Sequence, residues 1–544
     1  MTRNIKIFTS LLSILLLASC SKSLLNEDSR AEPTANQLFT SKDGFQNALN
    51  GLYDEVRRYR SGDTRSNPIN DIMSMQAMIG TDDAYGNWRD PNIDVFNLWK
   101  VINNPSFGHY NDVWSWLYET INAANTIVNR AAEAKIEWTD AEKNNIVAQA
   151  RLIRAWCYRH LTNLWGDVPL NLEESTGANI KTDWQRTPVA QVREAMRDDL
   201  LFAEQNLPVT SPSDAQLIQG IASHYLAELY LSMGKADSAK IEATKVTTNP
   251  SYKLMTARFG VNANNPGTPF TDMFLDGNSM RSDGNTETLW GIQNDMVING
   301  GEGNNIMRRY WANRYYSLKV KGTDGKTTSP VQVVAEAGGR GIGRLSPTRW
   351  MLDLFKGISD DRGSNFAWHY YYRMNTTPPK GFAIGDTVWL DSTSKETLSN
   401  PNWPSTSKWD WVSPTNALID PQYNDQAILR SAETYLLLAE ADYDLNDMQG
   451  AADAINALRA RAHAAPVDAS NITIDLILDE RAKELFSEED RRYVLLRTHK
   501  WLDRVQQYNK IASPNIAARD TLLPIPQSVI DANRTSPMTQ NPGY

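Results

Sequence analysis

The chain has 544 residues, of which 41% are hydrophobic, so it is long enough to bury a large core. Its formal net charge of −9 argues against nucleic acid as a partner, because binding to phosphates relies on lysine and arginine. With two cysteines and six histidines we expect no disulfide, no metal site and no cofactor. The 17 Trp and 21 Tyr residues are unusual, since such rings both fill cores and stack on ligands.

Residues 1–19 have the layout of a secretory signal peptide, with Arg3 and Lys6 before an apolar stretch and then small residues. The apolar stretch is shorter than the ~20 residues that span a bilayer. The segment LASC ending at Cys20 resembles the lipobox of bacterial lipoproteins, so we expect cleavage before Cys20 and lipid on its thiol. The alternative is an ordinary signal peptide followed by an accidental cysteine. Residues 20–38 are polar and aperiodic, which predicts a tether.

Helical patterns dominate the next part of the chain. Thr139 and Glu142 form a capping box, and apolar residues follow at steps of three or four until Gly166, namely Val147, Ala150, Ile153, Cys157, Leu161 and Leu164. Cys157 is therefore interpreted as a small buried apolar residue. Thr187 and Pro188 are predicted to open another helix as N-cap and first-turn proline, with an apolar face of Val189, Val192, Met196, Leu200, Ala203 and Leu207.

Two segments repeat one arrangement of small residues. Leu226-Ala227 precedes Ala239 by the same interval that Leu438-Ala439 precedes Ala451. Small residues at these places let two antiparallel helices approach closely, and the interval matches tetratricopeptide-type helical hairpins. Generic pairing of alanine-rich helices is the alternative for either segment alone.

The composition changes between residues 251 and 423, where Gly, Asn, Asp, Pro and Thr become frequent and helical periodicity is lost. Asp324-Gly325 lies between two short extended stretches and predicts a β-hairpin. We therefore expect a mostly α fold, with a helical scaffold over 39–250 and 424–510 that carries a loop-rich portion at 251–423. Loops on a rigid scaffold are where binding groups tend to lie.

Signatures of common enzymes are missing from the sequence. GTDGKTT at 322–328 lacks the first glycine of a phosphate loop, and neither HExxH nor GxSxG occurs. Adjacent acids such as Asp82-Asp83 and Asp360-Asp361 are interpreted as hydrated loop residues, because only their separation in space could make them a glycosidase pair. Acidic and basic residues alternate over 479–497, which we interpret as ion pairs between helices rather than as a ligand site.

Aromatic residues outside the regular helices are the remaining candidates for binding. Trp88 and Trp99 lie in one cluster, and Tyr315 and Tyr316 lie in another. Sugars present apolar CH faces rimmed by hydroxyls, so a ring below them and a polar group such as Asp82 beside them suit their chemistry. The alternative for each ring is that it plugs a loop onto the scaffold.

Several motifs together resemble the SusD/RagB-like family of outer-membrane nutrient-binding lipoproteins. The motifs are AQARLIRAWCYRHLTNLWGDVPL at 148–170, LLLAEADYDLNDMQGAADAINALRARA at 436–462 and ILDERAKELFSEEDRRYVLLRTHKW at 477–501, together with the ending LLPIPQSVIDANRTSPMTQNPGY. The resemblance covers essentially the whole mature chain, including the lipobox, and identifies 39–544 as a single SusD-like domain.

The resemblance implies about four tetratricopeptide-like hairpins and an irregular ligand-binding portion with short β-hairpins. It also implies a noncatalytic protein, lipid-anchored on the outer membrane and facing the cell exterior, that captures glycans for a SusC-like TonB-dependent transporter. Two alternatives stay open, a peptide-binding member of the family and a surface glycoside hydrolase. By order of motifs, the ligand loops correspond to 80–100 and 308–350, which contain Asp82, Trp88, Trp99, Tyr315 and Tyr316. The loops do not match residue by residue, so these five are chosen for their chemistry.

Overall fold

The computed structural model describes residues 35–60, 74–99, 102–177, 179–298, 306–391, 396–418 and 422–544. The predicted signal peptide, Cys20 and most of the predicted tether lie outside these ranges. The last 4 residues of the predicted tether form helix α2 (Ala35–Leu38), so regular structure begins before residue 39. Helix α2 packs on the start of the next helix, where the rings of Phe39 and Phe45 are 4.8 Å apart.

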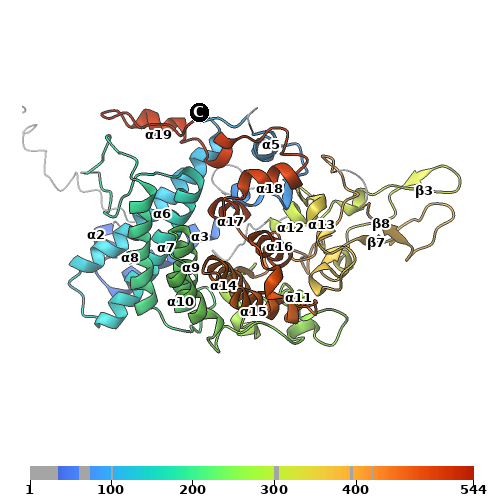
Figure 1. Ribbon diagram of the computed structural model, residues 1–544, viewed down its shortest axis with the longest axis horizontal. Helices are drawn as coiled ribbons and strands as arrows, with labels where there is room; N and C mark the ends of the chain where they lie inside the picture. Colours follow the sequence, from blue (N-terminus) through green and yellow to red (C-terminus); the bar gives the residue numbers. More distant parts are fainter. Residues whose placement is uncertain are drawn as a thin grey trace, which may run out of the picture.

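Long antiparallel helices form one continuous layer (Figure 1). Each helix packs on the next, which gives four hairpins in the described chain: α3/α6, α7/α8, α9/α10 and α14/α15. Their bounds are α3 Lys42–Arg57, α6 Gly108–Glu133, α7 Asp140–Trp165, α8 Val189–Asn206, α9 Gln219–Ser232, α10 Ala236–Thr247, α14 Ser431–Asp444 and α15 Met448–Arg461. Helices α16 (Ile474–Leu485), α17 (Arg491–Arg497) and α18 (Trp501–Tyr508) complete the scaffold. The predicted mostly α fold with tetratricopeptide-like hairpins is confirmed.

Local sequence signals account for the ends of these helices. The Thr139 hydroxyl accepts from the Glu142 backbone N–H, and the Glu142 carboxylate accepts from the Thr139 N–H, which confirms the capping box of α7. Helix α7 ends before Gly166, whose φ of 73° favours glycine. Helix α8 begins at Val189, so Pro188 lies at the N-cap and not inside the first turn as predicted.

The small residues of the repeated segments lie between paired helices. Ala227, Ala239, Ala439 and Ala451 each have 0% exposure. The first two belong to the α9/α10 pair and the last two to the α14/α15 pair, as their equal spacing predicts. A methyl group at these positions lets the two helix backbones approach closely.

The loop-rich portion contains only short elements among its described residues. Its strands pair antiparallel with one another or with strands from outside residues 251–423: β1 (Ala84–Gly86) with β5 (Leu345–Pro347), β2 (Thr288–Ile292) with β10 (Gln426–Arg430), β3 (Val320–Lys321) with β4 (Thr327–Thr328), β6 (Trp368–His369) with β9 (Ser405–Thr406), and β7 (Tyr371–Arg373) with β8 (Thr387–Trp389). Short helices lie beside them or at the chain ends: α4 Met75–Met78, α5 Pro91–Leu98, α11 Pro269–Asp272, α12 Met307–Trp311, α13 Arg349–Asp353 and α19 Gln527–Ala532. The β3–β4 pair confirms the predicted hairpin, and Gly325 in its turn has φ of 79°.

The loop-rich portion leaves and rejoins the helical layer at one place. Helix α10 packs directly on α14, although residues 251–423 separate them in the chain. Strands β2 and β10 pair at the base of this excursion. Figure 1 shows the β3 and β7–β8 hairpins extending from the far side of the loop-rich portion, away from α6–α10.

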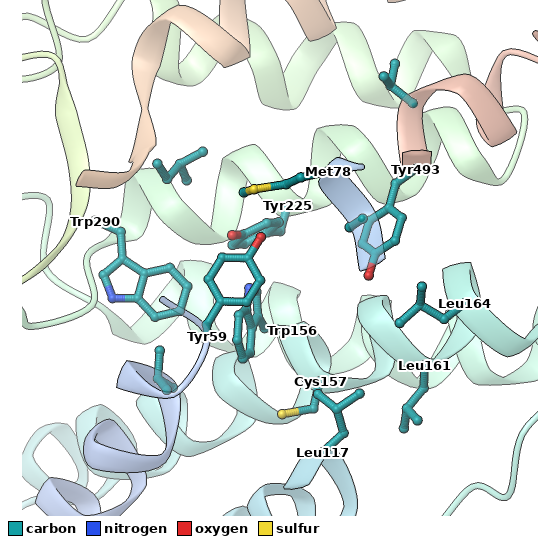
Figure 2. Close-up of a cluster of buried hydrophobic side chains, with 14 of the residues drawn as sticks. Tyr59, Met78, Leu117, Trp156, Cys157, Leu161, Leu164, Tyr225, Trp290 and Tyr493 are labelled. Carbon is teal, nitrogen blue, oxygen red and sulfur yellow. The ribbon is translucent and has the colours of Figure 1, made fainter. Parts of the chain in front are cut away.

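An aromatic cluster joins the scaffold to the base of the loop-rich portion (Figure 2). The ring of Trp156 on α7 lies 5.3 Å from Tyr59 and 5.7 Å from Trp290 on β2, in edge-to-face contacts. Cys157 is buried beside them, and burial raises the pKa of its thiol. The prediction of a buried apolar Cys157 is therefore confirmed.

Buried ion pairs hold the C-terminal helices to distant segments. Glu484 on α16 accepts hydrogen bonds from Arg362 of the loop-rich portion, Arg430 of β10 and Arg461 of α15. Arg362 also pairs with Asp360 at 2.7 Å, with both side chains essentially unexposed. Asp82 likewise pairs with Arg491 at 2.7 Å, with both side chains essentially unexposed. Asp360 and Asp82 are therefore buried in ion pairs, and the interpretation of them as hydrated loop residues was wrong. The network between helices predicted for 479–497 is confirmed.

Candidate ligand-binding surface

A groove opens in the loop-rich portion, where β7 runs past the segment 334–337. It has a volume of about 430 Å³ and is lined by Val334, Glu336, Ala337, Asn365, Asn375 and the run Trp368–Arg373. Strands β6 and β7 come from this run, so the period-2 alternation of strands turns some of its rings into the core and others toward the groove. Trp368 and Tyr372 are buried, whereas Tyr370 and Tyr371 are half-buried.

The exposed aromatic surface beside the groove is a cross-strand pair. Tyr371 on β7 lies directly opposite Trp389 on β8, with ring centroids 5.0 Å apart. The Arg373 guanidinium lies 5.0 Å from the Tyr371 ring. Trp389 has 66% exposure, although a large apolar ring normally gains 1.5–3 kcal/mol or so from burial. The hairpin therefore presents flat rings and a cationic edge to solvent.

A stack of rings supports this hairpin from below. Tyr372 lies between His369, at 5.2 Å, and Tyr315, at 4.3 Å, with both interplanar angles 19°. The His369 imidazole pairs with Asp410 at 2.7 Å. Burial disfavours the charged imidazole, but the Asp410 carboxylate outweighs burial and raises the pKa of His369. The stack fixes the backbone from which Tyr370 and Tyr371 project.

The groove has the chemistry that a saccharide requires. Its rings offer apolar faces, and its exposed rim carries a carboxylate from Glu336, an amide from Asn365 and the guanidinium of Arg373. Ring stacking contributes roughly 1–3 kcal/mol per aromatic in the comparable case of nucleobases. Polar groups at the rim can then select hydroxyl geometry.

Two of the predicted residues, Trp88 and Tyr316, lie near the surface, and the loop that contains Arg314 connects them. Trp88 is half-buried, and the Arg314 guanidinium lies 4.9 Å from its ring. Arg314 directly precedes Tyr315 and Tyr316 in the chain, and Tyr316 is half-buried against the Tyr315 ring at 5.9 Å. A ligand-binding role for Trp88 and Tyr316 stays a prediction.

The other three predicted residues are fully buried and cannot contact a ligand in this structure. Asp82, Trp99 and Tyr315 each have 0% exposure. Tyr315 belongs to the ring stack and donates its hydroxyl to the Gly339 carbonyl at 2.9 Å. Trp99 packs edge-to-face on Trp501 at 6.0 Å inside the main core. For these two rings, the alternative that they plug loops onto the scaffold describes what is observed.

Asp82 ties the loop after α4 to the C-terminal helices. Its carboxylate accepts from Arg491 at 2.7 and 2.8 Å and from Arg504 at 2.7 Å. Burial alone would raise the pKa of Asp82, but the two arginines outweigh it and hold that pKa below its usual value. The neighbouring Asp83 is buried with weaker compensation, and burial raises its pKa to about 7.

Sequence reasoning missed Tyr370, Tyr371 and Trp389. A signal was present, because the aromatic run at 368–372 is followed by a stretch rich in Pro and Gly and then by TVWL, which is the pattern of a long hairpin. Cross-strand pairing then places Tyr371 and Trp389 opposite each other.

Neither a metal centre nor a membrane span is found in the part of the chain that the structure describes. No three or more His, Cys, Asp or Glu side chains there are grouped so as to hold a metal ion. Among the same residues, every helix is too short or too polar to cross a bilayer.

Comparison with known proteins decides the family. The model described as "SusD family" matches residues 286–544, and the model described as "Starch-binding associating with outer membrane" matches residues 25–231. The chain belongs to the SusD/RagB-like family. A SusD-like protein of Formosa agariphila is 23% identical over 97% of both chains, and one of Bacteroides ovatus is 27% identical over 44% of each.

Solved structures share the fold of this SusD-like chain. A SusD homologue from Bacteroides thetaiotaomicron matches with a TM-score of 0.71 at 19% identity, covering 95% of this chain and 100% of its own. A structure titled "Laminarin binding SusD-like protein" matches with a TM-score of 0.68 at 19% identity, covering 92% and 99%. At these identities the likeness establishes the fold alone.

Proposed function

We propose that this SusD-like protein is a cell-surface lipoprotein that binds glycans and delivers them to a SusC-like TonB-dependent transporter. The observation that carries the proposal is the ring pair of half-buried Tyr371 and exposed Trp389, which lies beside a groove with polar groups on its rim. A structural relative is named for laminarin binding and a matching family model for starch binding, which supports glycans as the ligand class. The protein is held to the outer membrane through lipid on Cys20 and acts as a binding protein, not an enzyme.

The assignment is tested by calorimetric titration of the chain from Ser21 onward with a panel of oligosaccharides. We expect Tyr371→Ala to weaken binding about 5- to 150-fold, the equivalent of ~1–3 kcal/mol of stacking. Tyr443→Ala is the matched control, because Tyr443 is half-buried on α14 in the scaffold. Unchanged affinity in Tyr371→Ala would place the glycan elsewhere, and Trp88→Ala then tests the neighbouring loop.

Two further measurements separate the alternatives. Short peptides titrated in the same way would produce heat if the protein is a peptide-binding member of the family. New reducing ends released from polysaccharides would indicate a surface glycoside hydrolase, whereas a binding protein releases none. A third experiment tests the transporter and the anchor. A barrel transporter should copurify with the full-length protein, and this copurification should be lost in Cys20→Ala.

A further inference from the structure

A second, larger groove lies on the helical scaffold, away from the loop-rich portion. It has a volume of about 610 Å³ and runs between one face of α6, the segment 169–184 and the C-terminal segment that contains α19. Figure 1 shows α19 lying across the end of the helical layer, above α6. On α6 the lining residues Asn111, Ser115, Tyr118 and Asn122 follow one another at steps of four, three and four, so they share one face of the helix.

Hydrogen bonds fix the walls of this scaffold groove. The Trp184 backbone N–H donates to the Asn533 side chain at 2.7 Å, and the Asn533 amide donates back to the Trp184 carbonyl at 2.8 Å. The Ser528 hydroxyl donates to the Asn111 side chain, which ties α19 to α6. The groove is therefore preformed, and binding a ligand there carries little cost of ordering its walls.

Aromatic rings form the floor and one wall of the scaffold groove. Trp114 and Tyr118 lie side by side with centroids 5.1 Å apart and an interplanar angle of 36°. The Trp165 ring supports Trp114 edge-on at 5.1 Å. Trp184, from the segment 169–184, also lines the groove; it is half-buried, with the Lys181 ammonium 4.8 Å from its ring. Aromatic rings from two separate segments of the chain therefore line the groove.

The polar groups of the groove include donors that the fold leaves unused. The Trp114 indole N–H, the Ser115 hydroxyl and the Asn122 amide N–H₂ donate no hydrogen bond to any residue in the described ranges. Ser115 and Asn122 lie on the same face of α6, and the Trp114 indole belongs to the aromatic floor. Because an unmet donor in a partly buried groove favours a ligand that accepts hydrogen bonds, the groove suits a molecule rich in oxygen acceptors.

We propose that the scaffold groove is a second binding site for a short neutral oligosaccharide, independent of the groove beside Tyr371. The ligand class rests on the proposed function, whereas the site rests on its own geometry. The charged lining residues are one cation, Lys181, and one anion, Glu119, and both are exposed, so the groove does not select an ionic ligand. A volume of this size lies within the range of about 300–1,000 Å³ that small-molecule sites occupy.

An extended peptide fits the scaffold groove less well than a saccharide. Extended peptides gain affinity by adding a strand to an exposed sheet edge. The lining residues belong to helices α6 and α19 and to irregular segments, with no strand among those described. The ring faces and single donor groups match the CH faces and separate hydroxyls of sugar rings instead.

The site is tested by ¹⁹F NMR of the chain from Ser21 onward labelled with 5-fluorotryptophan, with the Trp184 resonance assigned by Trp184→Phe. The probes are maltoheptaose, laminarihexaose, xylohexaose, chitohexaose and mannohexaose, and penta-alanine represents peptides. We expect at least one oligosaccharide to shift the Trp184 resonance saturably, both in the parent and in Tyr371→Ala. Ser115→Phe, which fills the groove from the half-buried face of α6, should abolish the shift while the melting temperature and the binding at Tyr371 are retained.

The possible results distinguish the second site, its ligand class and the groove beside Tyr371. The second site is overturned if no oligosaccharide shifts the Trp184 resonance, or if the shift is equally large in Ser115→Phe. This holds even if glycans bind at Tyr371. A shift caused by penta-alanine alone overturns the saccharide assignment. A sugar that shifts Trp184 while Tyr371→Ala binds it with unchanged total affinity supports the scaffold groove and counts against the groove assigned under the proposed function.

Discussion

The Glu484→Gln substitution tests whether buried ion pairs hold the loop-rich portion to the scaffold. Glu484 has 0% exposure and accepts hydrogen bonds from Arg362 at 3.4 Å, from Arg430 at 3.2 Å and from Arg461. Burial alone would raise the pKa of Glu484, but the charges of these arginines outweigh it and lower that pKa well below its usual value. The carboxylate is therefore ionised at neutral pH and joins three segments of the chain.

Glutamine keeps the shape of this side chain but removes its charge and turns an acceptor into a donor that faces a guanidinium. Removing one partner of a buried ion pair typically costs about 3–5 kcal/mol. Proteins are stable by only about 5–15 kcal/mol, so the variant should lose a large fraction of its stability. We expect the loss to stay nearly constant between pH 5 and 8, because the Glu484 carboxyl, with an ordinary pKa of 4.5 and a lower one in the folded state, is mostly ionised over that range in both the folded and the unfolded parent.

Urea unfolding followed by circular dichroism measures the loss. Asp353→Asn is the matched control, since Asp353 pairs with Arg349 at 3.0 Å with side chains 45% and 29% exposed. An exposed pair of this kind contributes about 0–1 kcal/mol. The reasoning is refuted if Glu484→Gln unfolds within about 1 kcal/mol of the parent, as the control should.

Three further predictions concern stability. Burial lowers the pKa of His224 from 6.5 to about 3, so between these pH values the unfolded chain takes up a proton that the folded chain does not, and stability falls as the pH falls. In urea titrations, the free energy of unfolding of His224→Gln should therefore fall by about 2 kcal/mol less than that of the parent between pH 7 and 5. An equal fall in both proteins would contradict this. Ala439→Leu should cost about 1–3 kcal/mol or more through overpacking, whereas Ala→Leu at the exposed Ala190 of α8 should change the free energy of unfolding by less than about 0.5 kcal/mol. In thermal melts, Trp99→Ala should cost about 3–5 kcal/mol because it opens a core cavity, and Trp88→Ala should cost clearly less. The reverse order would mean that Trp99 is not a packing residue.

The helical part of the fold could be predicted because its signals are local. A capping box, a Gly after the last turn and the spacing of small residues all act within a few turns, so Thr139, Gly166 and Ala439 lie where the pattern places them. The hairpin at Asp324-Gly325 is local in the same sense.

The burial of the predicted site residues was harder to foresee, because it depends on contacts with residues far along the chain. Asp82 pairs with Arg491, 409 residues away, and no short-range pattern announces that contact. Trp99 contacts Trp501 in the same way. The aromatic content of the loops could be read from the sequence, but which of those rings face solvent depends on strand pairings such as β7 with β8.

The direct packing of α10 on α14 means that the excursion of the chain between them is an insertion into a continuous helical stack. Its two ends meet, and β2 and β10 close it at the base. Recognition loops mounted in this way can lengthen, shorten or change composition without shifting the register of the helices that carry them. A shared scaffold can thus diversify its selectivity among relatives while the stack that supports it stays constant.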